Sequence, residues 1–154
     1  MPAQAPAPPE ETEQSPTNEP ESSVEDPALM IQELLAQINE ERSTAGASSL
    51  VLDSALSSVA QLRAEECTTH FGHTRPNGTI YRTAVTDAGI SYQHLGENLA
   101  TGQFSPQSVM QSWDNSDGHH DNIVNEDYTK VGIGLAKNTN GKYDGYSWVV
   151  VFSD

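Results

Sequence analysis

An alternation of bulky and very small residues near the C-terminus places the strongest constraint on how this chain can fold. Across residues 130–137 aliphatic residues alternate with glycine or alanine, as Val131-Gly132-Ile133-Gly134-Leu135-Ala136. Side chains alternate between the two faces of a β-strand, so the segment is predicted to be a strand with one bulky and one nearly bare face. The bare face predicts that another backbone, or a helix, packs very close to it.

A second strand is predicted at residues 146–152, which are apolar enough to lie in the centre of a sheet. Residues 138–145 join the two strands, and Asn140-Gly141 within them is a hairpin signal. Residues 90–102 are interpreted as mostly loop and short strand.

Helical patterns dominate the part of the chain before this sheet. A helix is expected to begin at Asp26-Pro27, a capping residue before a proline suited to the first turn, and to end near Ser43. A second helix is expected after Asp53, with Cys67 on its buried face as a small core residue rather than a nucleophile. Shorter helices are expected at residues 79–88, with Ile80 on the packed side, and from Ser105-Pro106 to Trp113.

The order of these elements favours an α+β fold, a three-layer α-β-α sandwich around a small antiparallel sheet. We expect one domain at residues 28–154, preceded by a tail or linker at residues 1–27. The first thirty residues hold seven of the nine prolines and seven acids, with no lysine or arginine. Such a composition predicts a disordered segment, kept extended by proline as a spacer, although a plain leader is the alternative.

Composition excludes several classes of function. The net charge of −15 argues against nucleic acid or an anionic membrane as the main partner. A single cysteine allows no intramolecular disulfide and no thiol-rich zinc motif. No apolar run is long enough for a membrane-spanning helix, and no signal peptide is visible. We expect a monomer that is secreted or attached to the cell surface.

The densest group of side chains that could bind a metal or move a proton lies at residues 113–123, WDNSDGHHDNI. Two outlying residues of the same chemical kinds are His73 and Glu97, and only the family resemblance described below predicts that they meet this stretch in one cleft. His120 is interpreted as an exposed residue on the flank of a helix, with auxiliary ligation as the alternative. Glu41 lies off the apolar stripe of its helix and is interpreted as part of a solvated face.

Several motifs in order resemble the CAP superfamily, named for cysteine-rich secretory proteins, antigen 5 and pathogenesis-related 1 proteins, and most of all its secreted bacterial branch. Residues 71–78 (FGHTRPNG) are similar to the branch's F-S-H-x-R-P-D-G, and residues 96–100 (GENLA) to G-E-N-[IL]-A. Residues 113–123 resemble W-x-x-S-x-G-H-R-x-N-I, and residues 131–134 (VGIG) resemble V-G-[VI]-G. The resemblance covers about residues 29–152.

The resemblance implies an α-β-α sandwich whose central cavity is lined by two histidines and two acids, which in some members hold a divalent cation, often zinc. Carried over, the histidines are His73 and His119, and the first acid is Glu97. The second acid falls on Ser116, which bacterial relatives often share, and Asp114 or Asp117 are the candidate replacements. His120 stands where the branch usually has arginine.

Three hypotheses for function follow. In the first, which we favour, the cleft of His73, Glu97, Ser116 and His119 binds a ligand such as a lipid, a cell-wall fragment or a protein. In the second, His73, Glu97 and His119 hold zinc or another divalent cation in a metal-dependent hydrolase. The missing second acid weakens this case, because a hydrolase needs a general base beside its water. In the third, the domain is a structural module of the cell surface.

Overall fold

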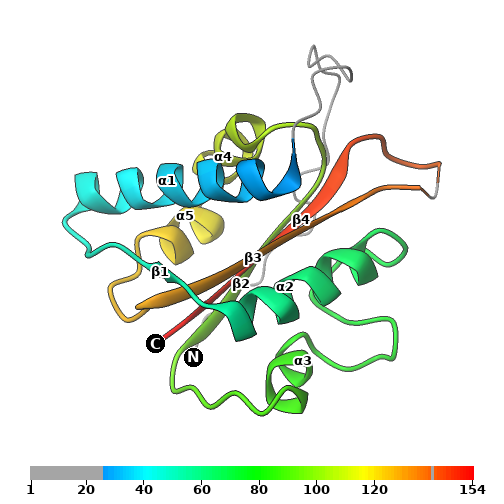
Figure 1. Ribbon diagram of the computed structural model, residues 1–154, viewed down its shortest axis with the longest axis horizontal. Helices are drawn as coiled ribbons and strands as arrows, with labels where there is room; N and C mark the ends of the chain where they lie inside the picture. The colour runs from blue at the N-terminus through cyan, green and yellow to red at the C-terminus, as the bar shows by residue number, and fades with distance from the viewer. Residues whose placement is uncertain (1–25, 140) are drawn as a thin grey trace.

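A computed structural model of the chain describes residues 26–139 and 141–154; most of the predicted tail, residues 1–25, and Asn140 of the predicted hairpin lie outside these residues. The elements follow in the order α1 (Pro27–Ala45), β1 (Val51–Leu52), α2 (Ser54–Cys67), α3 (Arg82–Asp87), β2 (Leu95–Gln103), α4 (Pro106–Asp114), α5 (Asp117–Ile123), β3 (Lys130–Lys137) and β4 (Tyr146–Ser153). Figure 1 shows a central sheet with helices on both sides. The predicted α+β sandwich is confirmed.

The sheet has the order β1-β3-β4-β2. β4 pairs antiparallel with both β2 and β3, so it is the central strand predicted for residues 146–152. The two-residue strand β1 pairs parallel with β3. The sheet is therefore mixed, with a short parallel edge beside β3 and with β2 at the opposite edge.

Each face of the sheet carries its own layer of helices and its own core. Helices α1, α4 and α5 cover one face, where their apolar residues form a cluster around Trp113 and Trp148. Helices α2 and α3 cover the other face, around Leu56, Ala64 and Val151. Both tryptophans are fully buried, as expected of core anchors.

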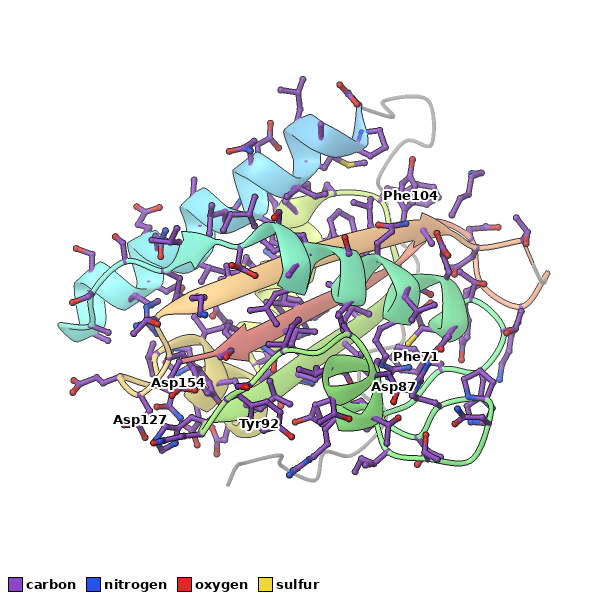
Figure 2. All side chains as sticks on the ribbon, turned by 60° about the horizontal axis from the view of Figure 1, so that its bottom comes forward. Phe71, Asp87, Tyr92, Phe104, Asp127 and Asp154 are labelled. Carbon is purple, nitrogen blue, oxygen red and sulfur yellow. The ribbon has the colours of Figure 1, made fainter. Side chains whose placement is uncertain are left out.

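The bare face of β3 lies directly beneath α2, as the alternation predicted. A Cβ atom added at Gly132 would lie 2.2 Å from the backbone carbonyl carbon and oxygen of Leu56. The side chain of Gln61 completes this contact, because its amide both donates to the carbonyl oxygen of Leu135 and accepts from its backbone N–H. Figure 2 shows α2 crossing over the sheet.

The predicted starts of α1 and α2 are confirmed, and α1 ends at Ala45, two residues beyond the expected Ser43. The Asp26 side chain accepts a hydrogen bond from the backbone of α1, and Gly46 ends this helix in the left-handed conformation with φ of 87°. The Asp53 side chain caps α2 in the same way. Cys67 is buried, and burial raises the pKa of its thiol to about 11, which agrees with a core residue.

Two expectations for the middle of the chain were wrong. The helix expected at residues 79–88 is shorter, and it buries Tyr81 while Ile80 remains 47% exposed. Residues 90–102 contain all but the last residue of β2 (Leu95–Gln103), a nine-residue strand that is buried throughout, rather than mostly loop. Glycine, glutamate and asparagine disfavour strands on their own, but pairing with β4 along the whole length outweighs that preference.

In the part of the chain that the structure describes, no helix combines the length and the apolar character needed to cross a membrane.

Candidate functional site

Glu97 and Asn98 in the edge strand β2 organise the candidate site. Neighbouring residues of a strand point to opposite faces. Glu97 points toward the α2 side, where Arg63 reaches it, and Asn98 points toward α5, where its side-chain amide donates to the carbonyl oxygen of His119 at 3.1 Å. The site therefore spans the edge of the sheet, where the two helical layers meet.

The carboxylate of Glu97 is fully buried and both of its oxygens are engaged. Arg63 donates to Oε2 at 2.7 Å and to Oε1 at 3.1 Å, and Nδ1 of His73 lies 2.9 Å from Oε1. The predicted contact between His73 and Glu97 is therefore present. Burial lowers the pKa of Arg63, but the adjacent Glu97 carboxylate outweighs that effect and raises it overall.

The loop that carries His73 is held from both ends. Arg63 also donates to the carbonyl oxygen of Gly72 at 2.7 Å, which anchors the residue before the histidine. Beyond it, residues 75–78 form a turn, closed by the hydrogen bond from the Gly78 N–H to the Arg75 carbonyl. The turn brings the backbone of Tyr81 back to that of His73, and their rings lie 5.9 Å apart.

His119 belongs to α5, in the other helical layer, and its buried ring lacks hydrogen-bond partners in the described part of the chain. It is 5% exposed, and neither of its ring nitrogens has a hydrogen-bond partner among the described residues. Burial, with a smaller contribution from the charge of His73, lowers the pKa of His119 to about 4. The hydroxyl of Tyr81, also buried, has no partner within the same residues. Buried polar atoms of this kind require a partner, such as a bound ligand, ion or water.

Ser116 occupies the position where the family resemblance placed a second acid. It is the residue before α5, and its carbonyl oxygen accepts from the backbone of His120. Neither candidate replacement for the acid joins Glu97: Asp114 points toward α1 and Asp117 is exposed. Ser116 is half-buried and is the N-cap residue of α5, although its side chain makes no capping hydrogen bond.

Glu97 is engaged by Arg63 and His73, and the ligand atoms of His73, Glu97 and His119 do not form a group within 4.8 Å of one another in the described residues, so any metal ion here would have to bind through the imidazole nitrogens. An ionised carboxylate only accepts hydrogen bonds, so Nδ1 of His73 is the donor, and in a neutral imidazole ring the lone pair is then on Nε2. Carboxylates commonly orient metal-binding histidines in this way. Two imidazoles would thus supply the donors, and Glu97 would hold one of them in position.

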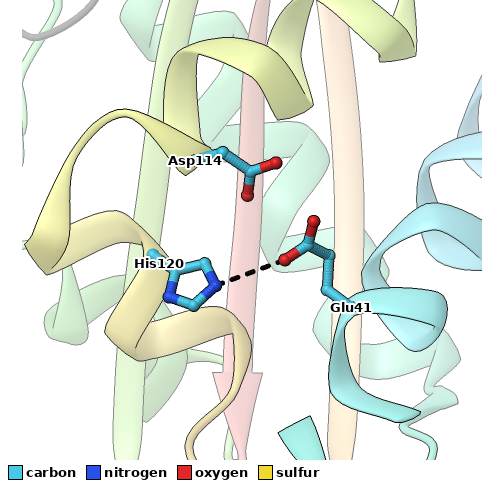
Figure 3. Close-up of side chains that lie close together, drawn as sticks. All are labelled: Glu41, Asp114 and His120. Carbon is cyan, nitrogen blue, oxygen red and sulfur yellow. Dashed lines mark hydrogen bonds and ion pairs between the residues drawn. The ribbon is translucent and has the colours of Figure 1, made fainter. Parts of the chain in front are cut away.

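A different group of side chains has the tighter ligand geometry. Among the described residues, one group of three or more histidine, cysteine or acidic side chains has all its ligand atoms within 4.8 Å of one another, and it consists of Glu41, Asp114 and His120. Figure 3 shows the three side chains converging between α1, the end of α4 and α5. Sequence reasoning missed this group, because Glu41 is 79 positions from His120 and no motif links them.

Sequence reasoning also missed two residues of the first site. Arg63 occupies a position on the buried stripe of α2, between Ala60 and Ala64, and a buried arginine requires a buried acceptor. Tyr81 precedes Ala84 and Val85 by helical spacing. These two signals were available in the sequence, although neither identifies its partner.

The protonation of His119 has a consequence for stability. As the pH falls from 6.5 toward 4, the unfolded chain binds a proton at His119 that the folded chain excludes. The free energy of unfolding should therefore fall over this range, by up to about 3 kcal/mol at pH 4. Urea denaturation in the presence of a chelator measures this slope, and His119→Gln should reduce it. The control His94→Gln, at a histidine whose side chain is 45% exposed, should keep it; equal slopes in all three proteins would contradict the assignment.

Comparison with known proteins identifies one family model and two relatives from Bacillus subtilis that match this chain. A family model described as CAP, cysteine-rich secretory protein family, matches residues 35–152. The uncharacterized protein YkwD of Bacillus subtilis is 35% identical over 101 residues, which cover 64% of this chain and 39% of the relative. The membrane protein YlbC of the same organism is 27% identical over 66 residues, covering 43% of this chain and 19% of the relative. This chain therefore spans about two fifths or less of the length of these two relatives.

Solved structures agree with the family match. An outer surface protein of Borrelia burgdorferi is similar with a TM-score of 0.75 and 26% identity, over 84% of this chain and 96% of that one. A cysteine-rich secretory protein from Staphylococcus aureus has a TM-score of 0.70 and 20% identity, over 84% of this chain and 40% of that one. The family model covers most of the chain and the fold agrees with it, so the chain belongs to the CAP, or cysteine-rich secretory protein, family.

Proposed function

We propose that this CAP domain is a secreted or cell-surface module that binds a ligand in the cleft of His73, Glu97, Ser116 and His119. The observation that carries the proposal is His119, which is buried with both ring nitrogens lacking a partner among the described residues. The unpartnered Tyr81 hydroxyl lies in the same region, beside His73. Both groups gain hydrogen bonds or coordination from a bound ligand, which offsets the cost of burying them.

The proposed location outside the cell rests on other support. The Borrelia burgdorferi relative is described as an outer surface protein, and a structural neighbour from Bacillus anthracis with 24% identity as an extracellular protein. The acidic, proline-rich residues 1–27 have the composition of a spacer between an attachment point and the domain.

The ligand is a divalent cation, an organic molecule such as a lipid or cell-wall fragment, or a protein segment. Each of these would bind through the imidazole rings of His73 and His119. A zinc-type ion would use Nε2 of His73 and a nitrogen of His119, with waters in the other positions. An organic or peptide ligand would instead donate hydrogen bonds to these nitrogens. Both modes require neutral imidazole, so binding should weaken under acidic conditions.

Hydrolase activity has less support. Both Glu97 oxygens are occupied by Arg63 and His73, so this carboxylate is not free to take a proton from an attacking water. Asp114, a candidate for the second acid, contacts Glu41 and His120 instead. The arrangement can hold and orient a ligand, but no free acid–base group lies beside the histidines in the described residues.

The decisive measurement is a zinc titration near neutral pH by calorimetry in a His120→Gln background, which removes the second group of candidate ligands. We expect binding that the further changes His73→Ala and His119→Ala together abolish. Equal heat with and without these changes would exclude metal from the cleft. A thermal-shift panel of lipids and peptidoglycan fragments then tests organic ligands, and the absence of any shift in both experiments would leave a purely structural surface module.

A further inference from the structure

The second histidine of α5 faces away from the cleft. Successive residues of a helix are about 100° apart around its axis, so His120 projects toward α1 while His119 faces β2. Nε2 of His120 lies 3.2 Å from Oε1 of Glu41, and Asp114 completes a group whose ligand atoms are all within 4.8 Å of one another (Figure 3).

An ion pair between Glu41 and His120 does not account for all three side chains. It leaves Asp114 as a second carboxylate beside Glu41, and like charges in contact destabilise the fold unless a proton or a cation lies between them. The neighbouring Arg42 does not neutralise the pair, because its guanidinium is buried and donates to backbone carbonyls such as those of Ile123 and Asn125.

The group is open to an ion from solution. The side chains of His120 and Glu41 are 39% and 31% exposed. A groove of about 430 Å³ runs beside them between α1 and α4, and Glu41 and Asp114 form part of its wall together with Glu40 and Gln111. An ion bound by the three side chains would keep positions that face the groove and could hold water.

The donor set indicates the class of ion. Two carboxylate oxygens and one imidazole nitrogen suit zinc and similar transition-metal ions, whereas calcium and magnesium favour oxygen ligands alone. The three residues come from three helices, so an ion there would also link α1, α4 and α5. We propose that Glu41, Asp114 and His120 form a second binding site, independent of the His73–Glu97–His119 cleft, for a divalent transition-metal ion of the zinc type.

The proposal is tested by titrating the full chain with zinc. Two-dimensional NMR records the signals of each histidine ring separately, and calorimetry measures the affinity and the stoichiometry. The signals of His120 are expected to shift with zinc, and Asp114→Asn and Glu41→Gln should each weaken this site about tenfold or more. His120→Gln should remove one zinc from the stoichiometry. All three side chains are partly exposed, so the variants are expected to fold, which circular dichroism verifies.

The matched control is His94→Gln, since His94 lies 3.8 Å from the single carboxylate of Asp127 and has no second acid in a comparable group among the described residues. It should leave zinc binding unchanged. Unmoved His120 signals at millimolar zinc, or equal affinity in wild type and Asp114→Asn, would overturn the second site. The signals of His73 and His119 report on the cleft in the same experiment, so failure of one site is distinguishable from failure of the other.

Discussion

Replacing Arg63 with methionine is expected to lower the free energy of unfolding by about 3–5 kcal/mol. Neither the Arg63 nor the Glu97 side chain is exposed, and the substitution leaves a buried carboxylate without its two-point partner. The same change removes the hydrogen bond to the Gly72 carbonyl, which anchors the loop before His73. Urea denaturation near neutral pH measures the loss without adding salt.

Two further variants separate the charge effect from the packing effect. The double variant Arg63→Met/Glu97→Met should regain part of the lost stability, because it removes the unpaired charge along with its partner. The control Arg75→Met breaks a pair with Glu66 whose side chains are 10% and 14% exposed, and Glu66 keeps its hydrogen bond from Arg63, so the change should cost less than Arg63→Met. An Arg63→Met protein as stable as the Arg75→Met control would contradict the assigned role of the buried pair.

The parts of the fold that sequence predicted are those governed by local spacing. Capping residues and apolar repeats locate α1 and α2 because both signals act within one or two helical turns. Only a short strand was predicted where the nine-residue β2 lies, because its composition disfavours a strand and its stability comes from β4, about fifty residues further along the chain.

The residues of the candidate site also divide into those that the sequence could predict and those that it could not. The contact of His73 with Glu97 was expected only through the family resemblance, since 24 residues separate them and spacing alone brings nothing together. Arg63 could have been noticed as a charge on an apolar stripe, but its two-point contact with Glu97 depends on how α2 crosses the sheet. The group of Glu41, Asp114 and His120 depends on the packing of three helices, which no local pattern encodes.

The second large effect is expected at the bare face of β3. Gly132→Ala would place a Cβ atom 2.2 Å from the backbone of Leu56, and Gly134→Ala would place one 2.5 Å from the backbone nitrogen of Gln61. Helix backbone cannot rotate aside as a side chain does, so α2 must move off the sheet. We expect each substitution to cost about 3 kcal/mol or more in the free energy of unfolding, again measured by urea denaturation.

The control is Ala136→Ser, which adds one heavy atom at the next small position on the same face, where the side chain is half-buried. It should change the free energy of unfolding by less than about 1 kcal/mol. A Gly134→Ala protein as stable as this control would show that α2 can shift at little cost, contrary to the close contact described above.

Displacement of α2 in Gly134→Ala should also change the geometry of the cleft. Gln61, whose side chain bonds to the backbone of β3, is two residues from Arg63, whose guanidinium holds Glu97 and the loop of His73. Movement of the helix away from Gly134 therefore lengthens the contact that orients His73. In Gly134→Ala, the ring signals of His73 should shift in the NMR spectrum while those of His120, on the opposite helical layer, stay in place. Unchanged His73 signals in a destabilised Gly134→Ala protein would mean that the cleft is positioned independently of the glycine face.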